Sequence, residues 1–375
     1  MDFDFTDDQQ QLRDAVHKWV ERGYGFERRR GIEAGKEGVP GFSRAAFTEL
    51  AELGLCGLYI PEDDGGLGMG PIEGMVVMEE LGRGIVLEPL AQSLIAGAVL
   101  SGYAGAELRG SWLPRISSGE ALVVLAQQER KARYRLNACE TTAVQAGSGW
   151  ALTGSKNMVP AGDQADAWLV PAMASGKLAM FLVERTAKGV STRGYGTQDG
   201  GRAADVTLDK TAAQLVTADG LTALEHAVDI GIASLCAEAV GVMDQTLAVT
   251  LDYMNTRKQF GVAIASFQAL RHRAADMKMQ LELARSMSYY ASLKLNAPAD
   301  ERRRAMARAK YQLGLSMRFV GQQAVQLHGG IGMTDEYIVS HYFKKLTQLE
   351  MTYGDSLHQL GEVSARMQET AGVFA

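Results

Sequence analysis

The chain has 375 residues, of which 46% are hydrophobic and 22% charged, and its formal net charge is −6. This length exceeds one ordinary hydrophobic core and predicts two or three domains of a soluble globular protein. The acidic balance, without a run of Lys and Arg, argues against binding to nucleic acid or to an anionic membrane.

Cysteine usage and hydropathy favour the cytoplasm. Cys56, Cys139 and Cys236 lie far apart and form no CxxC pair, so three buried thiols in a reducing compartment are expected. Charged or polar residues interrupt every apolar run before the roughly 20 residues that a membrane span requires. The acidic N-terminus is unlike a secretory signal.

Residues 1–119 are predicted to form an N-terminal α-helical domain. Thr6 and Gln9 have the spacing of a capping box ahead of an apolar helical pattern, and Ser43 is placed to cap a second helix. The glycine-rich segment 65–68 predicts a turn.

Residues 120–218 are predicted to form a central β domain. The short apolar runs 122–126, 168–170 and 178–183 alternate with Gly, Asp and Asn. Residues 205–209 alternate between apolar and polar side chains, as a half-buried strand does.

Residues 219–375 are predicted to form a C-terminal four-helix bundle. Apolar residues recur there at three- and four-residue steps, consistent with three helices of roughly 25–30 residues joined by short loops. A fourth helix is expected from about Asp335, with a break at Gly354. The predicted fold class is therefore α+β and mostly α.

The glycine clusters 66–70 and 329–332 each superficially suggest a phosphate-binding loop. Neither follows a strand with GxGxxG and a helix start, so a Rossmann site is not predicted, and each taken alone favours a turn. The six histidines contain no HxxxH pair and join no cluster of Cys or carboxylates. No metal site is predicted.

Three ordered blocks resemble the acyl-CoA dehydrogenase family. Residues 256–261, TRKQFG, match its RxxFG pattern and are followed at family spacing by 267–277, with FQ and ADM. Residues 326–333, QLHGGIGM, are similar to its QxxGGxG motif, and 54–68 match a third stretch. The resemblance covers essentially the whole chain and agrees with the order helical, β, helical.

This resemblance implies an FAD-dependent α,β-dehydrogenation of acyl-CoA thioesters in fatty acid metabolism. It also implies a tetramer, homo- or heteromeric, in which two neighbouring subunits share each FAD, and an electron-transfer flavoprotein as partner. Arg257 would pair with the pyrophosphate, Phe260 and Phe267 would lie near the flavin and adenine, and Gly329 and Gly330 would allow close backbone approach. The implied cofactor-binding residues are Arg257, Gln259, Phe260, Phe267, Gln326, Leu327, Gly329 and Gly330.

The family's catalytic carboxylate has no counterpart at either position where the family places it. In the stretch that resembles the family's YEGTS, this chain reads TYGDS and has Tyr353 in place of the glutamate. The alternative position, early in the first bundle helix, is Gly231 by counting back from Arg257. A tyrosine with a pKa near 10 is only about 0.1% ionised at pH 7. The catalytic base is therefore unassigned.

The motifs on the flavin side of the β domain also depart from the family. Residues 127–132, QQERKA, stand where the family has TEPxxGSD, and 158–160, MVP, stand where it has WIT. Residues that a subunit lends to its neighbour's FAD are kept, whereas those around its own flavin are replaced. This asymmetry resembles the small subunits of bacterial heteromeric enzymes such as pimeloyl-CoA dehydrogenase and steroid side-chain dehydrogenases.

Two alternatives remain open at this point. The chain could be a self-sufficient homo-oligomeric dehydrogenase with an unrecognised base, for which Glu350 is the candidate, although a surface or ion-pairing role is favoured for that residue. It could also be a non-enzymatic scaffold that binds acyl-CoA and keeps only the fold.

Overall fold

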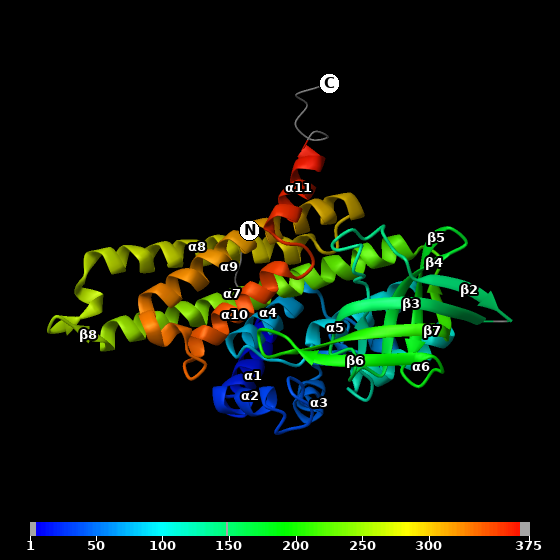
Figure 1. Ribbon diagram of the computed structural model, residues 1–375, viewed down its shortest axis with the longest axis horizontal. Helices are drawn as coiled ribbons and strands as arrows, with labels where there is room; N and C mark the ends of the chain where they lie inside the picture. The colour runs from blue at the N-terminus through cyan, green and yellow to red at the C-terminus, as the bar shows by residue number, and fades with distance from the viewer. Residues whose placement is uncertain (1–4, 148, 368–375) are drawn as a thin grey trace. The chain divides into compact units, whose positions relative to one another are not determined.

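The computed structural model describes residues 5–147 and 149–367 (Figure 1). The chain divides into two compact units that each combine distant segments. Unit 1 comprises Met1–Phe26, Met75–Val86 and Ile232–Ala375, and unit 2 comprises Glu27–Gly74 and Leu87–Gly231. Helices come first along the chain, then strands, then helices again, which confirms the predicted fold class. The predicted division into three domains, with boundaries at 119/120 and 218/219, stays a prediction.

Unit 2 holds the sheet and most of the shorter helices. Its helices are α2 (Phe26–Glu33), α3 (Arg44–Glu52), α5 (Leu90–Tyr103) and α6 (Ala106–Ser117), with the 3-10 turns η1 (Leu55–Gly57) and η2 (Glu62–Asp64). Its strands are β1 (Val123–Leu125), β2 (Thr142–Ala146), β3 (Gly149–Pro160), β4 (Ala167–Ala174), β5 (Lys177–Glu184), β6 (Val190–Gly196) and β7 (Arg202–Thr217).

Five of these strands close a barrel. The pairings run from β4 to β2, β3, β7 and β5, and β5 pairs with β4 again. All are antiparallel except the short parallel pairing of β2 with β4. β1 adds to β4 in parallel, and β6 pairs with the first half of β7. Closure leaves few unpaired strand edges, which β proteins otherwise have to protect.

A buried helix supports this barrel within unit 2. In α5 the side chains from Leu90 to Leu100 are almost all apolar and buried. The amide of Gln92 is an exception, and its Oε1 accepts a hydrogen bond of 2.9 Å from the backbone N–H of Leu125. A helix that is apolar on nearly all sides belongs in a core, and the single amide satisfies a strand donor there.

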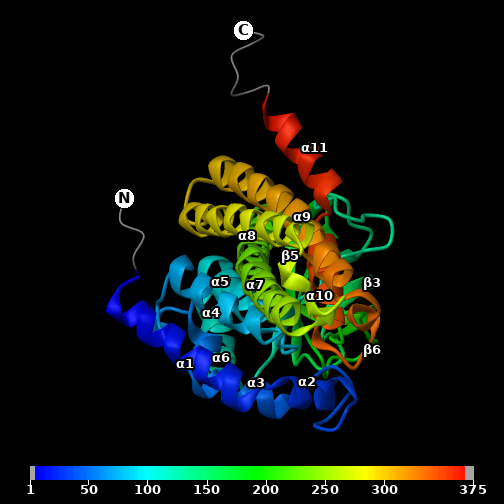
Figure 2. The same ribbon diagram turned by 90° about the vertical axis from the view of Figure 1, so that its left-hand side faces the viewer.

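Unit 1 contains the long helices. They are α1 (Asp7–Gly23), α4 (Pro71–Arg83, from Met75), α7 (Gly220–Thr256, from Ile232), α8 (Gln268–Lys294), α9 (Ala299–His328), α10 (Ile338–Met351) and α11 (Ser356–Met367). α8 and α9 have the expected length, whereas α7 is longer, with 37 residues. Figure 2 shows α8 and α9 side by side.

The local signals behave as predicted. Thr6 and Gln9 form the capping box of α1, and the Ser43 side chain caps α3. The fourth bundle helix, α10, begins at Ile338, three residues after the expected point. The break falls at Gly354, whose φ of 108° no ordinary L-residue adopts, and α11 follows.

Among the described residues, α7 is the single helix long and apolar enough to cross a membrane by length and composition. Within its most apolar window, 89% of the residues are buried inside the structure. A core helix passes the same test, so the feature is weak evidence for a membrane span.

In unit 1, α4 and α7 cross with their backbones in contact at two glycines. A Cβ added to Gly241 would lie 1.9 Å from the carbonyl oxygen of Glu79, and one added to Gly82 would lie 2.1 Å from that of Glu238. Only glycine allows so close an approach.

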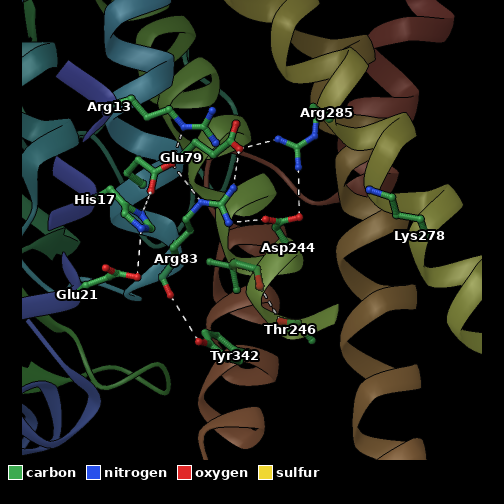
Figure 3. Close-up of polar contacts among 12 residues, drawn as sticks. Arg13, His17, Glu21, Glu79, Arg83, Asp244, Thr246, Lys278, Arg285 and Tyr342 are labelled. Carbon is green, nitrogen blue, oxygen red and sulfur yellow. Dashed lines mark hydrogen bonds and ion pairs between the residues drawn. The ribbon is translucent and has the colours of Figure 1, made fainter. Parts of the chain in front are cut away.

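Charged side chains surround this crossing (Figure 3). Glu80, 1% exposed, accepts from Arg13 at 2.9 Å and from Arg83 at 3.2 Å. Arg83 also pairs with Asp244, and Arg285 pairs with Glu79 at 2.6 Å. The network ties α1, α4, α7 and α8 together, and each buried carboxylate has cationic partners, as burial of charge requires.

Candidate functional site

The loop after α7 projects an aromatic side chain into solvent. The backbone N–H of Arg257 donates to the carbonyl of Tyr253 at 2.8 Å, and a hairpin of β8 (Lys258–Gln259) and β9 (Val262–Ala263) follows. Phe260 and Gly261 form its tip with φ values of 53° and 80°. Positive φ at both positions is typical of the tight turns that match the twist of a hairpin.

The side chains of this hairpin are exposed and, where polar, without partners. Phe260 is 91% exposed and meets Phe267 edge-on, with ring centroids 6.1 Å apart. Within the described part of the chain, Arg257 and Gln259 have exposed side chains that make no hydrogen bond or ion pair. An unpaired guanidinium beside two accessible rings is suited to a ligand with both phosphate and aromatic groups.

The second block lies at the end of α9. Gln326 is exposed, and its side chain has no partner among the residues described, whereas Leu327 packs in the core with 6% exposure. Gly329 has a φ of 63°, and a Cβ on either Gly329 or Gly330 would meet nothing within 4 Å. The glycines therefore leave backbone accessible, and Leu327 can offer a ligand only its backbone.

An aromatic contact joins the two blocks within unit 1. The rings of Tyr253 and His328 stack with centroids 4.4 Å apart, and the Tyr253 hydroxyl donates to the His328 carbonyl at 3.3 Å. The Tyr337 ring lies 5.3 Å from the imidazole and 6.3 Å from the Tyr253 ring, so the three rings form one cluster. The structure thus brings the Arg257 loop and the Gly329–Gly330 loop to one end of the bundle.

Sequence reasoning missed Tyr253 and His328. The available signal was their position, since Tyr253 precedes Arg257 by one helical turn and His328 directly precedes the two glycines. We call this group, with Arg257, Gln259, Phe260, Phe267 and Gln326 to Gly330, the bundle-end site.

The bundle-end site fits one side of an FAD molecule. The unpaired guanidinium of Arg257 can bind a pyrophosphate, and the accessible aromatic rings can pack on flat heterocycles. The two glycines let their backbone come close to the cofactor. In addition, Nε2 of His328 is buried and has no hydrogen-bond partner in the described structure. A buried polar atom without a partner is uncommon in a folded protein and calls for an explanation such as a ligand.

The two positions at which the resemblance places a base, Tyr353 and Gly231, carry no carboxylate. Tyr353, in the loop between α10 and α11, has a φ of 56°, and its carbonyl accepts from Nε2 of Gln359 at 2.8 Å. Gly231 is buried in the interior of α7. Position 353 therefore lies in a tight turn with a positive φ, but its side chain is a phenol and not a carboxylate.

The carboxylate of Glu350 is held by internal hydrogen bonds and an ion pair. It is 7% exposed, and its Oε1 accepts from the backbone N–H of Ser356 at 3.0 Å and from that hydroxyl at 2.7 Å. Arg318 lies 3.3 Å from the same oxygen. Glu350 thus caps the start of α11 and is an ion-pairing residue, as favoured, although it is buried rather than on the surface.

The segment that replaces the flavin-side motif in unit 2 contains a buried ion pair. Oε1 of Glu129 accepts from Lys156 at 2.7 Å and from the Thr141 hydroxyl at 2.6 Å. Burial alone would raise the pKa of Glu129, but the ammonium and the donors of Thr141 and Glu140 outweigh it and lower the pKa from 4.5 to about 2. Glu129 is therefore a fixed anion rather than a proton carrier.

The backbone that replaces the family's WIT is engaged in internal contacts. Met158 has a φ of 54°, and its N–H donates to the Tyr195 hydroxyl at 3.2 Å. That hydroxyl donates in turn to Asp205 at 3.0 Å. Within unit 2 the Met158 amide is thus occupied by an internal hydrogen bond.

An open cavity of about 870 Å³ lies beside this segment in unit 2. Its charged lining includes Arg130, Lys131 and Arg193, and also Glu129, Glu140, Asp205 and Asp209. Because Glu129 is paired with Lys156, the remaining three carboxylates face three cations, and the lining carries no net positive charge that would favour a polyphosphate. No group of His, Cys, Asp and Glu placed to hold a metal ion occurs among residues 5–147 and 149–367.

The chain matches two parts of one family along most of its length. Residues 6–120 match the acyl-CoA dehydrogenase N-terminal domain, and residues 218–368 match the C-terminal domain. Acyl-CoA dehydrogenase FadE27 of Mycobacterium tuberculosis is 28% identical over 99% of this chain and 100% of its own length. FadE12 of the same species is 30% identical over 89% of each chain.

Solved structures that resemble this chain agree with these family matches. The ChsE4-ChsE5 complex from Mycobacterium tuberculosis contains a chain with a TM-score of 0.89 and 27% identity, covering 99% of this chain and 100% of that one. FAD is the cofactor of this family, as the resemblance predicted, and a similar solved structure is that of an FAD-dependent dehydrogenase, 26% identical with a TM-score of 0.87 and covering 98% of this chain and 100% of that one. The chain belongs to the acyl-CoA dehydrogenase family.

Proposed function

We propose that this chain is a subunit that completes the FAD site of a catalytic acyl-CoA dehydrogenase partner. The bundle-end site would hold the pyrophosphate and adenine end of an FAD whose ring is seated in the neighbouring subunit. In this proposal the partner supplies the base, the assembly is a heterotetramer in the cytoplasm, and an electron-transfer flavoprotein accepts the electrons.

One observation carries the proposal. The polar side chains of the bundle-end site, Arg257, Gln259 and Gln326, are exposed and have no partner within the described chain, whereas Met158 and Glu129 are occupied by internal contacts. What sets these three side chains apart from other exposed polar residues is that they gather at one end of the bundle with the exposed ring of Phe260 and the open glycines 329 and 330, and this grouping supports a ligand shared with another subunit. The similar ChsE4-ChsE5 structure is a complex of two proteins, which agrees with a heteromer.

The division of labour follows from the residues. FAD, when bound, accepts the hydride that leaves the β-carbon of the acyl-CoA. The role of this chain would be to bind and orient: Arg257 neutralises phosphate charge, and Phe260 and Phe267 cover the cofactor with apolar faces. Because Tyr353 and Gly231 offer no group ionised at neutral pH, removal of the α-proton falls to the partner.

Arg257→Ala is expected to weaken FAD binding in the assembled protein. A charge-assisted contact of this kind contributes about 1.5–3 kcal/mol, so the Kd for FAD should rise roughly tenfold to a hundredfold. The measurement is a fluorescence titration of the apo-assembly with FAD.

Arg308→Ala is the matched control, since Arg308 is an exposed arginine on α9 outside the bundle-end site. It should leave the Kd unchanged. An unchanged Kd in the Arg257 variant as well would remove the support for the proposal.

A further inference from the structure

The outer edge of strand β6 in unit 2 is unpaired. Among the described residues, β7 is the one strand that pairs with β6, in an antiparallel register that runs from Val190 opposite Leu208 to Gly196 opposite Arg202 (Figure 1). No other part of the described chain is hydrogen-bonded to the backbone of residues 191–196 from the outer side. In a strand paired on one side, alternate N–H and C=O groups point outward, so this edge presents a row of donors and acceptors.

This edge lacks the features that keep a strand from pairing with other chains. β6 reads VSTRGYG, seven residues without Pro or Lys, and its register with β7 is regular. Proteins commonly protect an exposed edge with such residues, with a bulge, or by covering it with a helix or loop. An edge left open over this length is the kind of surface to which an extended peptide adds as a further strand.

The centre of the edge carries a cation without a partner. The side chain of Arg193 is exposed and makes no hydrogen bond or ion pair in the described part of the chain. Its opposite residue in β7 is Asp205, but that carboxylate accepts from the Tyr195 hydroxyl at 3.0 Å. Both Arg193 and Asp205 line the open cavity of unit 2. A strand added to β6 would therefore place one of its own side chains beside Arg193, on the side away from Asp205.

Charge selects the occupant of this edge. A side chain of opposite charge beside Arg193 stabilises the pairing of the strands, whereas a like charge destabilises it. A second copy of β6 paired in full antiparallel register would set Arg193 against Arg193, so the edge does not favour its own copy. A carboxylate in that place would continue the alternation of Asp205 and Arg193 across the sheet.

We propose that the outer edge of β6 binds an extended segment of a partner protein that carries an Asp or Glu side chain beside Arg193. The backbone of the segment would pair with the edge, and its carboxylate would bind the guanidinium. The inference goes beyond the proposed function and does not depend on it, because β6 lies in unit 2 and the bundle-end site in unit 1.

The test is binding of two synthetic peptides to the full-length chain, measured by fluorescence anisotropy and by hydrogen–deuterium exchange. Each peptide has seven residues that alternate Thr and Val, with Glu at the centre of one and Lys at the centre of the other. The Glu peptide should bind and protect the amides of residues 190–196. The Lys peptide should bind about fivefold to tenfold more weakly, because a cross-strand attraction becomes a repulsion.

Variants of the chain test the charge from the other side. Arg193→Glu should reverse the preference and bind the Lys peptide more tightly than the Glu peptide. Lys177→Glu is the matched control, since Lys177 is an exposed cation at the start of β5, which does not pair with β6. This control should keep the preference of the parent chain. Both side chains are exposed, so the melting temperatures of the two variants should equal that of the parent.

Several results would overturn the inference, and the peptide comparison on the parent chain gives them without any substitution. They are the absence of binding by either peptide at millimolar concentration, protection only outside residues 190–196, and equal affinity for the two peptides. Protection of residues 190–196 that rises with the concentration of the chain alone would also overturn it, because a second copy would then occupy the edge.

Discussion

Gly241→Ala is expected to cause a large loss of stability in unit 1. The new Cβ would lie 1.9 Å from the carbonyl oxygen of Glu79 and 3.0 Å from the backbone nitrogen of Arg83, so α4 and α7 would have to separate. Overpacking against a backbone that cannot rotate away costs about 3 kcal/mol or more. Separation would also stretch the ion pair of Arg83 with Asp244.

The measurement is the thermal unfolding midpoint, followed by circular dichroism at the helical signal. Gly361→Ala is the control, because Gly361 is an exposed residue of α11 whose added Cβ meets nothing within 4 Å. There the substitution should be neutral or stabilise by up to about 1 kcal/mol, since alanine favours helix over glycine. Equal midpoints for the two variants would show that α4 and α7 do not cross as described.

Lys156→Met is expected to destabilise unit 2 by about 3–5 kcal/mol, because it leaves the buried carboxylate of Glu129 without its cation. Lys156 is fully buried, and its Nζ also donates to the Pro171 carbonyl at 2.8 Å. The control is Lys131→Met, which removes a pair with Glu140 whose side chains are 79% and 62% exposed. A pair so exposed to solvent adds little to stability, so this variant should unfold almost as the parent protein does.

The same ion pair predicts an acid dependence. The folded state lowers the pKa of Glu129 from 4.5 to about 2, so its contribution to stability is complete above pH 4.5 and is lost as the pH falls toward 2. The urea midpoint of the parent protein should decline through this window, and less steeply in the double variant Lys156→Met, Glu129→Gln.

The single variants test the ion pair itself. If Lys156→Met unfolds no more readily than Lys131→Met, the pair is not buried as described.

Features that depend on residues close together in the sequence could be predicted from the sequence alone. The capping box of Thr6 and Gln9 spans three residues, and its hydrogen bonds depend only on local geometry. The motif around Arg257 was equally readable, and the structure adds that the arginine is unpaired.

Contacts between residues far apart in the sequence could not be predicted from it. Glu129 and Lys156 meet across 27 residues, and nothing in either local pattern marks the partner. Gly82 and Gly241 looked like ordinary helix glycines, because the need for them arises only where α4 crosses α7. His328 looked like part of a glycine motif, because its ring contacts with Tyr253 and Tyr337 and its unsatisfied nitrogen arise only in the folded chain.

The most direct test of the central claim is an anaerobic titration with acyl-CoA, monitored at the flavin absorbance band, of the chain purified alone and with a catalytic partner. Because neither Tyr353 nor Gly231 offers a carboxylate, and the bundle-end site is proposed to form only one side of an FAD site, the chain alone should show little bound flavin and no bleaching. Bleaching should appear with the partner. Rapid bleaching by the pure, unmodified chain would contradict the account and send the search for a base elsewhere in this sequence.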